Sequence, residues 1–156
     1  MPSQSWSTYY AKNKVLIPTN VVTIVGVGME VEPMEIVDID NRVGIKHALL
    51  TVIAKGNPVV PHPSQKEMSR PTDIHKKLGF KSYKAFNFEA KLWDILRKNG
   101  VYSIDFYKIS DDGRGYNSLP DKRINFPINT PVESVVDKLI EIITQTYQEK
   151  KEAIIK

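Results

Sequence analysis

The chain has 156 residues, of which 41% are hydrophobic and 26% are charged, and these values exclude a disordered polypeptide and fit one globular domain. It contains no cysteine, which excludes a disulfide framework and thiolate chemistry and favours a reducing compartment. The sequence shows neither the pattern of a secretory signal nor an apolar run of about 18 residues. We therefore expect a cytoplasmic protein with no membrane partner.

The N-terminal third predicts strands followed by a helix. Apolar and β-branched residues fill positions 15–17 and 21–27 and are interrupted at Pro18-Thr19-Asn20, which indicates two strands joined by a tight turn. A third short strand is expected over 36–39, with its start fixed by Pro33. The 3.6-residue spacing of apolar side chains then predicts a helix over 42–55.

Residues 56–73 differ in kind from their neighbours. They hold four of the ten prolines of the chain among polar residues, which is typical of an extended, mobile connection. A short helix is expected to follow over 72–78, ended by Gly79.

The segment from Phe88 to Ile109 allows two interpretations. Leu92, Ile95 and Leu96 suit a helix, whereas the Asn99-Gly100 pair between two apolar-rich runs favours a β-hairpin, because both turn positions need a positive φ. We favour the hairpin. Residues 123–128 then predict a short strand, and the capping-box sequence at 130–133 opens a long amphipathic helix with a tail expected to fray from Gln148.

Two stretches of the sequence resemble each other, YYAKNKVLIPTNVVTIVGV and FEAKLWDILRKNGVYSIDF, and each is followed by a short strand and a helix. The chain thus predicts one domain, 1–156, with an internal repeat of 9–55 and 88–148 linked by 56–73. The expected fold class is α+β: a mixed, largely antiparallel sheet from two hairpin–strand–helix copies, with helices packed on it.

Residue patterns for catalysis or cofactor binding are missing. The three histidines are scattered without metal-ligand spacing, and Gly26-Val27-Gly28 is not followed by a phosphate-binding helix. Asp111-Asp112-Gly113 lacks the spacing and the glutamate of a calcium loop. We therefore expect that the chain is not an enzyme and that it binds neither a metal nor a cofactor.

Charges are separated along the chain. Between Lys76 and Lys98 there are seven basic residues and two acidic ones, interleaved with aromatic rings, as in a single-stranded RNA platform. The alternative, in which the rings belong to the core and the lysines to a solvated face, is favoured, so nucleic acid is not the expected partner. Five acidic residues and no basic one lie between positions 30 and 40: Glu30, Glu32, Glu35, Asp38 and Asp40. Separated patches of both signs suit a charged protein partner.

The stretch from Leu78 to Ile143 contains a leucine-glycine helix end, then FKSYKAFNFEAKLWDI, a hairpin, a polar loop, a strand and TPVESVVDKLIEII. This order resembles the immunity proteins of bacterial contact-dependent growth inhibition (CDI) systems, in which the N-terminal half also ends in a helix like VGIKHALLTVI. The resemblance implies a monomer that binds the C-terminal toxin domain, commonly a nuclease, of a cognate inhibition protein in a 1:1 complex. An RNA-binding accessory protein acting through Lys76–Lys98 is the alternative function.

The surface that would contact a toxin is expected in the charged loops. The polar loop and the start of the next strand offer anchors of the kind that dominate tight interfaces, namely Asp111, Asp112, Arg114, Tyr116, Lys122 and Arg123. Immunity proteins that mask basic nucleases tend to be acidic, whereas this chain has a net charge of +4. The contact would therefore use the acidic stretch 30–40, meet an acidic toxin surface, or block the toxin away from its active site.

Overall fold

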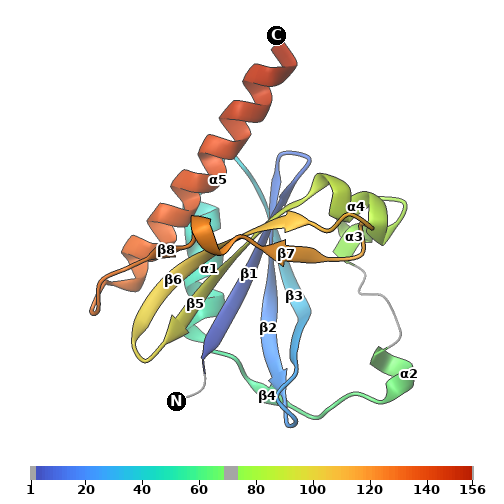
Figure 1. Cartoon of the computed structure of the whole chain (residues 1–156), viewed down its shortest axis with the longest axis vertical. Helices are drawn as coiled ribbons and strands as arrows, with labels where there is room; N and C mark the ends of the chain where they lie inside the picture. The colour runs from blue at the N-terminus through green and yellow to red at the C-terminus, as the bar shows by residue number, and fades with distance from the viewer. Residues whose placement is uncertain (1–2, 69–73, 156) are drawn as a thin grey trace.

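The computed structural model describes residues 3–68 and 74–155, with the backbone alone for 68, 154 and 155. Figure 1 shows a twisted sheet with helices on it and a long C-terminal helix that extends past the sheet. In chain order the elements are β1 (Gln4–Ala11), β2 (Lys14–Thr23), β3 (Gly28–Asp38), α1 (Arg42–Ala54), β4 (Val59–Val60), α2 (Gln65–Met68), α3 (Ile74–Lys77), α4 (Tyr83–Glu89), β5 (Lys91–Lys98), β6 (Val101–Ile109), β7 (Tyr116–Ser118), the 3₁₀ helix η1 (Pro120–Lys122), β8 (Ile124–Asn125) and α5 (Val132–Ile155).

The sheet has the order β3-β2-β1-β5-β6-β7, with β4 beside β2 and β8 beside β6. All neighbours are antiparallel except β2 and β4, which are parallel. The expected fold class, α+β with a mixed and largely antiparallel sheet, is confirmed. The two long hairpins meet at the centre, where β1 and β5 pair over seven residues of each strand.

One face of the sheet packs against α1 and α5. Alternate residues of the strands, such as Trp6 and Tyr10 of β1 and Ile95 of β5, point to this face and meet Leu49 of α1 and Leu139 of α5. The 3.6-residue periodicity of each helix gathers its apolar residues on the side toward the sheet. Each large side chain buried here contributes about 1.5–3 kcal/mol to folding.

The opposite face is covered at one end by α3 and α4. Phe80 and Phe86 pack there on Tyr9 and Leu16, with the Phe80 and Phe86 ring centroids 5.5 Å apart. The other end of this face carries polar side chains from several strands, and these residues form the candidate site described below.

The turn predicted at Pro18-Thr19-Asn20 is wrong. These residues lie inside β2, where the pairing with β3 shifts register between Ile17 and Thr19. Proline has no N–H to give to a ladder and is tolerated at such an irregularity. The chain turns instead at Lys12-Asn13, with φ of 50° and 62°.

Other strand predictions also need correction. The third strand begins at Gly28 rather than at Ile36 and runs through Pro33. The strand β1 was not predicted, because polar residues such as Ser5 and Ser7 interrupt its apolar pattern. The helix α4 and the strand β7 were not predicted either.

The hairpin interpretation of the Asn99-Gly100 region is confirmed. The strands β5 and β6 flank that pair, whose φ angles are 52° and 76°. The helix predicted over 42–55 is confirmed as α1, and the short helix before Gly79 as α3. Of the proline-rich connection, residues 69–73 lie outside the described part, and the remainder contains β4 and α2. The helix α5 continues to Ile155, past the Gln148 from which fraying is expected, and the fraying itself stays a prediction.

The order hairpin, strand, helix occurs twice, as β1-β2, β3, α1 and as β5-β6, β8, α5. Each third strand pairs with the second strand of its own hairpin. The turns, however, do not fall at the positions that the two aligned stretches share, because Pro18-Thr19-Asn20 is strand. The single domain 1–156 with an internal repeat stays a prediction.

Candidate functional site

The predicted binding loop is organised around Asp112. Its Oδ1 accepts hydrogen bonds from the Ser110 hydroxyl at 2.7 Å and from the Arg114 backbone N–H at 3.0 Å. These bonds lower the pKa of the Asp112 carboxyl. Asp111, Asp112 and Arg114 are all exposed, so this part of the loop is a free surface.

Tyr116 has a different position from the one predicted. Its hydroxyl donates to the backbone carbonyl of Asn87 at 3.2 Å, and its ring lies against Tyr9 with centroids 6.4 Å apart. Tyr116 is half-buried and ties the end of α4 to the sheet. Its hydrogen bond and ring contact therefore lie within the fold, and its role as a toxin contact stays a prediction.

The last two predicted contact residues, Lys122 and Arg123, lie in different surroundings. Lys122 is exposed at the end of η1. Arg123 reaches back to the sheet, where its Nε and Nη2 donate to the two carboxylate oxygens of Asp105, the second bond at 3.0 Å. The six predicted residues therefore form no single surface.

The predicted acidic patch is also divided, because side chains alternate between the faces of a strand. Glu30 lies on the polar end of the sheet face, and Glu32 on the same side pairs with Lys77. Asp38 pairs with Lys14, and Asp40 is exposed after the strand.

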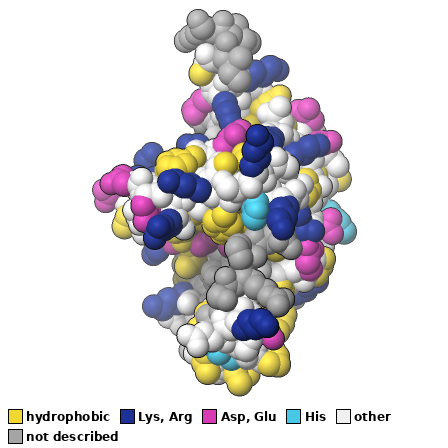
Figure 2. Space-filling model, turned by 90° about the vertical axis from the view of Figure 1, so that its right-hand side faces the viewer, with side chains coloured by type: hydrophobic (Ala, Val, Ile, Leu, Met, Phe, Trp, Pro, Cys, Tyr) yellow, Lys and Arg dark blue, Asp and Glu magenta, His cyan; other side chains and the backbone are white. Residues whose placement is uncertain are grey.

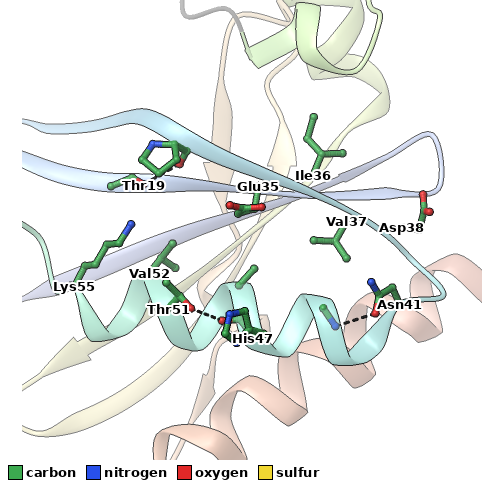
Figure 3. Close-up of a pocket in the computed structure, with 13 residues that line it drawn as sticks. Thr19, Glu35, Ile36, Val37, Asp38, Asn41, His47, Thr51, Val52 and Lys55 are labelled. Atoms are coloured by element: carbon green, nitrogen blue, oxygen red, sulfur yellow. Dashed lines mark hydrogen bonds between the residues drawn. The ribbon is translucent and has the colours of Figure 1, made fainter.

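Glu35 points to the other side and lines a groove between β3 and α1 (Figure 3). His47 and Lys55 of α1 lie across the groove from it. The Thr51 hydroxyl donates to the His47 carbonyl at 2.7 Å, and the Asn41 side chain accepts from the Gly44 N–H at 2.9 Å and caps α1. The polar groups drawn with dashed bonds in this groove thus serve the helix itself.

A row of polar residues crosses five adjacent strands of the sheet face opposite α1 and α5. Glu30 of β3 is opposite Asn20 of β2, Ser7 of β1 is opposite Asp94 of β5, and Asp94 is opposite Asp105 of β6. The Ser7 backbone N–H and hydroxyl donate to Asn20 Oδ1 at 3.3 and 3.0 Å. These bonds connect the residues of β3 and β2 to those of β1, β5 and β6. We call these five residues the polar row.

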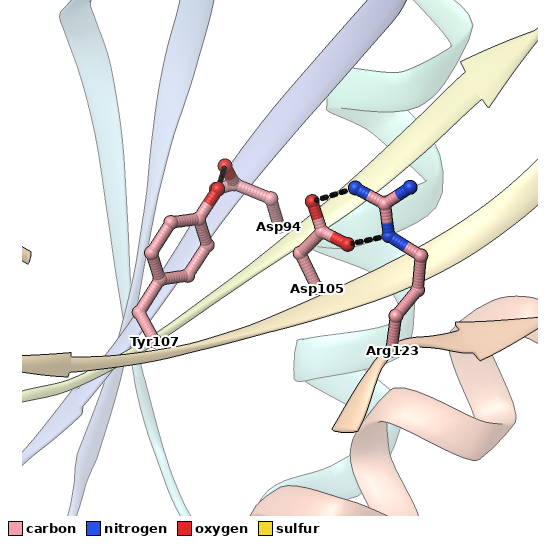
Figure 4. Close-up of polar contacts among 4 residues, drawn as sticks. All are labelled: Asp94, Asp105, Tyr107 and Arg123. Atoms are coloured by element: carbon pink, nitrogen blue, oxygen red, sulfur yellow. Dashed lines mark hydrogen bonds and ion pairs between the residues drawn. The ribbon is translucent and has the colours of Figure 1, made fainter. Parts of the chain in front are cut away.

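Each carboxylate of the polar row has one fixed donor beside it. The Tyr9 hydroxyl donates to Glu30 at 2.6 Å, and the Tyr107 hydroxyl donates to Asp94 at 2.7 Å. Figure 4 shows the second pair next to the doubly bonded pair of Asp105 and Arg123. Among the three acids, Asp105 alone forms an ion pair with a cation of the described residues.

Burial raises the pKa of Glu30 from 4.5 to about 7, and the nearby charge of Asp94 adds to the effect. Burial likewise raises the pKa of Asp94 from 3.8 to about 6. The phenol of Tyr107 has a raised pKa because of its burial and the adjacent Asp94 charge. Glu30 and Asp94 are therefore carboxylates whose charge is poorly compensated by the described residues.

The Ser7 hydroxyl lies near both acids and lowers the pKa of each, but it has a single proton. That proton goes to Asn20 Oδ1. Asp94 Oδ1 is consequently buried without a hydrogen-bond partner in the part of the chain that the structure describes. A buried acceptor of this kind costs free energy until a donor reaches it.

A hollow opens beside the polar row. Its walls come from β1, the β2–β3 hairpin and the chain before β4, and it is lined by Ser5, Ser7, Asn20, Glu30 and Asn57 among others. The Asn57 side chain donates to the Ser5 carbonyl at 3.0 Å and accepts from the Ser5 N–H at 2.9 Å, which fixes one wall.

Exposed apolar side chains border this hollow. Ile24 and Val25 of the β2–β3 turn are 70% and 64% exposed, and Val59 of β4 is 67% exposed. The Ile24 N–H donates to the Val60 carbonyl, so the turn and β4 lie together. Figure 2 shows hydrophobic side chains gathered at the lower end of the molecule, where these elements lie.

The basic and aromatic segment Lys76–Lys98 does not present a row of rings. Phe86 is fully buried and Trp93 is 4% exposed, whereas Phe88 is 54% exposed. Stacking of successive bases needs several exposed rings. The expectation that the rings belong to the core is confirmed for Phe86 and Trp93 and is wrong for Phe88.

Sequence reasoning found Glu30 but missed Ser7, Asn20, Asp94 and Asp105. A signal was present for the two aspartates, because each interrupts an apolar strand, as in KLWDIL and SIDFY. A charged residue flanked by strand-forming apolar residues has to find a partner or a function when the strand is central.

No family model and no curated protein matches the sequence. Solved structures do match. A protein of unknown function from Neisseria meningitidis is 14% identical, with a TM-score of 0.63 over 89% of this chain and 93% of that one. One chain of a CdiA-CT/CdiI toxin and immunity complex from Yersinia pseudotuberculosis is 10% identical, with a TM-score of 0.62 over 94% of this chain and 97% of that one. The likeness is one of fold.

Within the described residues, no helix is both long and apolar enough to span a bilayer. The same residues contain no group of three or more potential metal ligands in a suitable arrangement.

Proposed function

We propose that this chain is an immunity protein that binds and neutralises the C-terminal toxin domain of a cognate CDI protein. The observation that carries the proposal is the fold shared with a chain of a toxin and immunity complex over nearly the full length of both chains. The sequence resemblance described above, which rests on different grounds, points to the same class.

The physical construction supports a binding role rather than a catalytic one. Two hairpins are joined at the centre of one sheet and fixed by α1 and α5, so the surface side chains are held in place before a partner arrives. Preorganisation of this kind reduces the entropy lost on association. We propose a cytoplasmic monomer acting in a 1:1 complex.

The test is neutralisation of a toxin domain encoded beside this chain. Cells that produce the toxin domain alone should stop growing, and cells that also produce this chain should grow. The purified pair should elute as one 1:1 complex. A toxin domain from an unrelated CDI protein is the control and should not be neutralised. Growth arrest that persists in the presence of this chain, without complex formation, would exclude the proposed function.

A further inference from the structure

The hollow beside the polar row has the features of a receptor for one basic side chain. Glu30 and Ser7 lie in its wall, and Asp94 does not line it but lies opposite Ser7 on the next strand. Each of these carboxylates accepts a hydrogen bond from a phenol, and neither forms an ion pair with a described residue. Asp94 Oδ1 accepts no hydrogen bond from any described residue.

The same row shows what satisfies such an acid. Asp105 receives two hydrogen bonds from the Arg123 guanidinium, which comes from outside the five strands. A planar guanidinium presents donors on two edges, so it can serve two acceptors at once. Glu30 and Asp94 have no such cationic donor among the described residues, and a second guanidinium would supply one.

The border of the hollow indicates what surrounds the basic residue. Ile24, Val25 and Val59 are large apolar side chains on the surface, and the polar row is beside them. Interfaces commonly place a charged or aromatic anchor in a pocket with apolar contacts around it. A toxin segment with an arginine between apolar residues would complement both the acidic hollow and its apolar border.

We propose that the toxin domain inserts an arginine side chain into this hollow, where it pairs with Glu30 and is attracted by the nearby charge of Asp94, while adjacent apolar residues of the toxin cover Ile24, Val25 and Val59. This inference rests on the proposed function and names the surface that it uses. It replaces the loop 111–114 as the main contact, and it accounts for toxin binding by a chain of net charge +4 through a locally acidic surface.

The first experiment measures the affinity of an inactive toxin domain for variants of this chain. Glu30→Gln with Asp94→Asn keeps the acceptors for Tyr9 and Tyr107 and removes two charges. Asp111→Asn with Asp112→Asn removes the same two charges from the exposed loop and is the matched control. We expect the first pair to raise Kd about ten-fold or more and the second to change it less than about two-fold.

Equal affinities of the first pair and the wild-type chain would overturn the inference while leaving the proposed function intact. An equal loss in both pairs would also overturn it, because that result would reflect overall charge. Melting temperatures separate binding from folding, since the first pair should melt at the same temperature as the wild-type chain or higher.

The second experiment needs no toxin. N-acetyl-arginine amide is titrated into the labelled protein, and amide shifts are recorded by NMR. Shifts that concentrate at Ser7, Asn20 and Asp94, and that are lost in the Glu30→Gln and Asp94→Asn variant, are expected. If the toxin does not bind the wild-type chain, the proposed function fails, and of the inference only the guanidinium site in the hollow is left to be judged. The inference then fails as well if N-acetyl-arginine amide produces no such shifts.

Discussion

At the scale of single residues, the most consequential feature is the pair of buried carboxyls, Glu30 and Asp94. Both have a raised pKa, of about 7 and about 6, because burial penalises the charged form. Neither group could be assigned this property from the sequence, because the burial comes from strands that are distant in the chain. The groups that face them are the phenols of Tyr9 and Tyr107, the hydroxyl of Ser7, and the Asp105–Arg123 pair.

These raised pKa values predict an unusual pH dependence of stability. A carboxyl whose pKa is higher in the folded than in the unfolded state binds its proton more tightly when folded, so stability falls as the pH rises through that range. We expect the free energy of unfolding to be lower at pH 8 than at pH 5, by about 4 kcal/mol when both groups contribute. Denaturant unfolding at the two pH values measures the difference.

The Glu30→Gln and Asp94→Asn variant is the control for this effect, because it has no charge to titrate at these positions. Its stability should change little between pH 5 and pH 8. Asp112, whose pKa is lowered, ionises below this range and does not interfere. A wild-type stability that rises with pH, in parallel with the variant, would contradict the prediction.

Tyr116 yields a second prediction at this scale. Its hydroxyl bonds the carbonyl of Asn87, so Tyr116→Phe should lower the free energy of unfolding by about 1 kcal/mol. Tyr102→Phe is the matched control and should be nearly neutral, because no hydrogen bond of the Tyr102 hydroxyl is found among the described residues. Toxin affinity should be unchanged in both variants. A loss of affinity in Tyr116→Phe without a loss of stability would support Tyr116 as a contact residue.

At the scale of elements, the two long hairpins share one kind of turn. Each turns through two consecutive residues of positive φ, Lys12-Asn13 and Asn99-Gly100. The second pair was predictable because Asn-Gly is the common sequence for this turn, whereas lysine at the first turn gives no such signal. The stronger but misleading signal at Pro18 displaced the predicted turn into the strand β2.

The turn at Gly100 can be tested with a matched pair of glycines. Gly100 has a φ of 76°, and a Cβ there would meet no other atom within 4 Å, so Gly100→Ala adds strain from the backbone alone. We expect a loss of about 1 kcal/mol in the free energy of unfolding. Gly115→Ala is also placed in open space, and its φ is not positive, so it should cost little. Equal stabilities of the two variants would contradict the assigned turn.

At the scale of the whole molecule, one core joins both halves of the chain. Leu49 of α1 and Leu139 of α5 are fully buried in the same cluster with Trp6, Ile95 and Ile104. An element order that repeats thus does not produce two independent cores, because the halves share the central β1–β5 pairing.

This shared core predicts that the chain unfolds as one cooperative unit. Far-ultraviolet circular dichroism and tryptophan fluorescence should give coincident denaturation curves. Leu139→Ala should lower the free energy of unfolding by about 2–5 kcal/mol and shift both curves together. Separate transitions for the two signals would show that the two halves are distinct folding units.

The amino-acid sequence by itself determined the local elements: the helices α1 and α5, the hairpin at Asn99-Gly100 and the absence of cysteine chemistry. These depend on periodicity, turn residues and composition, which act over a few neighbouring positions. The tertiary structure alone decided which charged residues lie together. It dispersed the acids from Glu30 to Asp40, which are contiguous in sequence, over two faces and a loop. It also brought Glu30 and Asp94 into one row, because strand pairing places residues that are distant in sequence at adjacent positions and strand pleating separates neighbours.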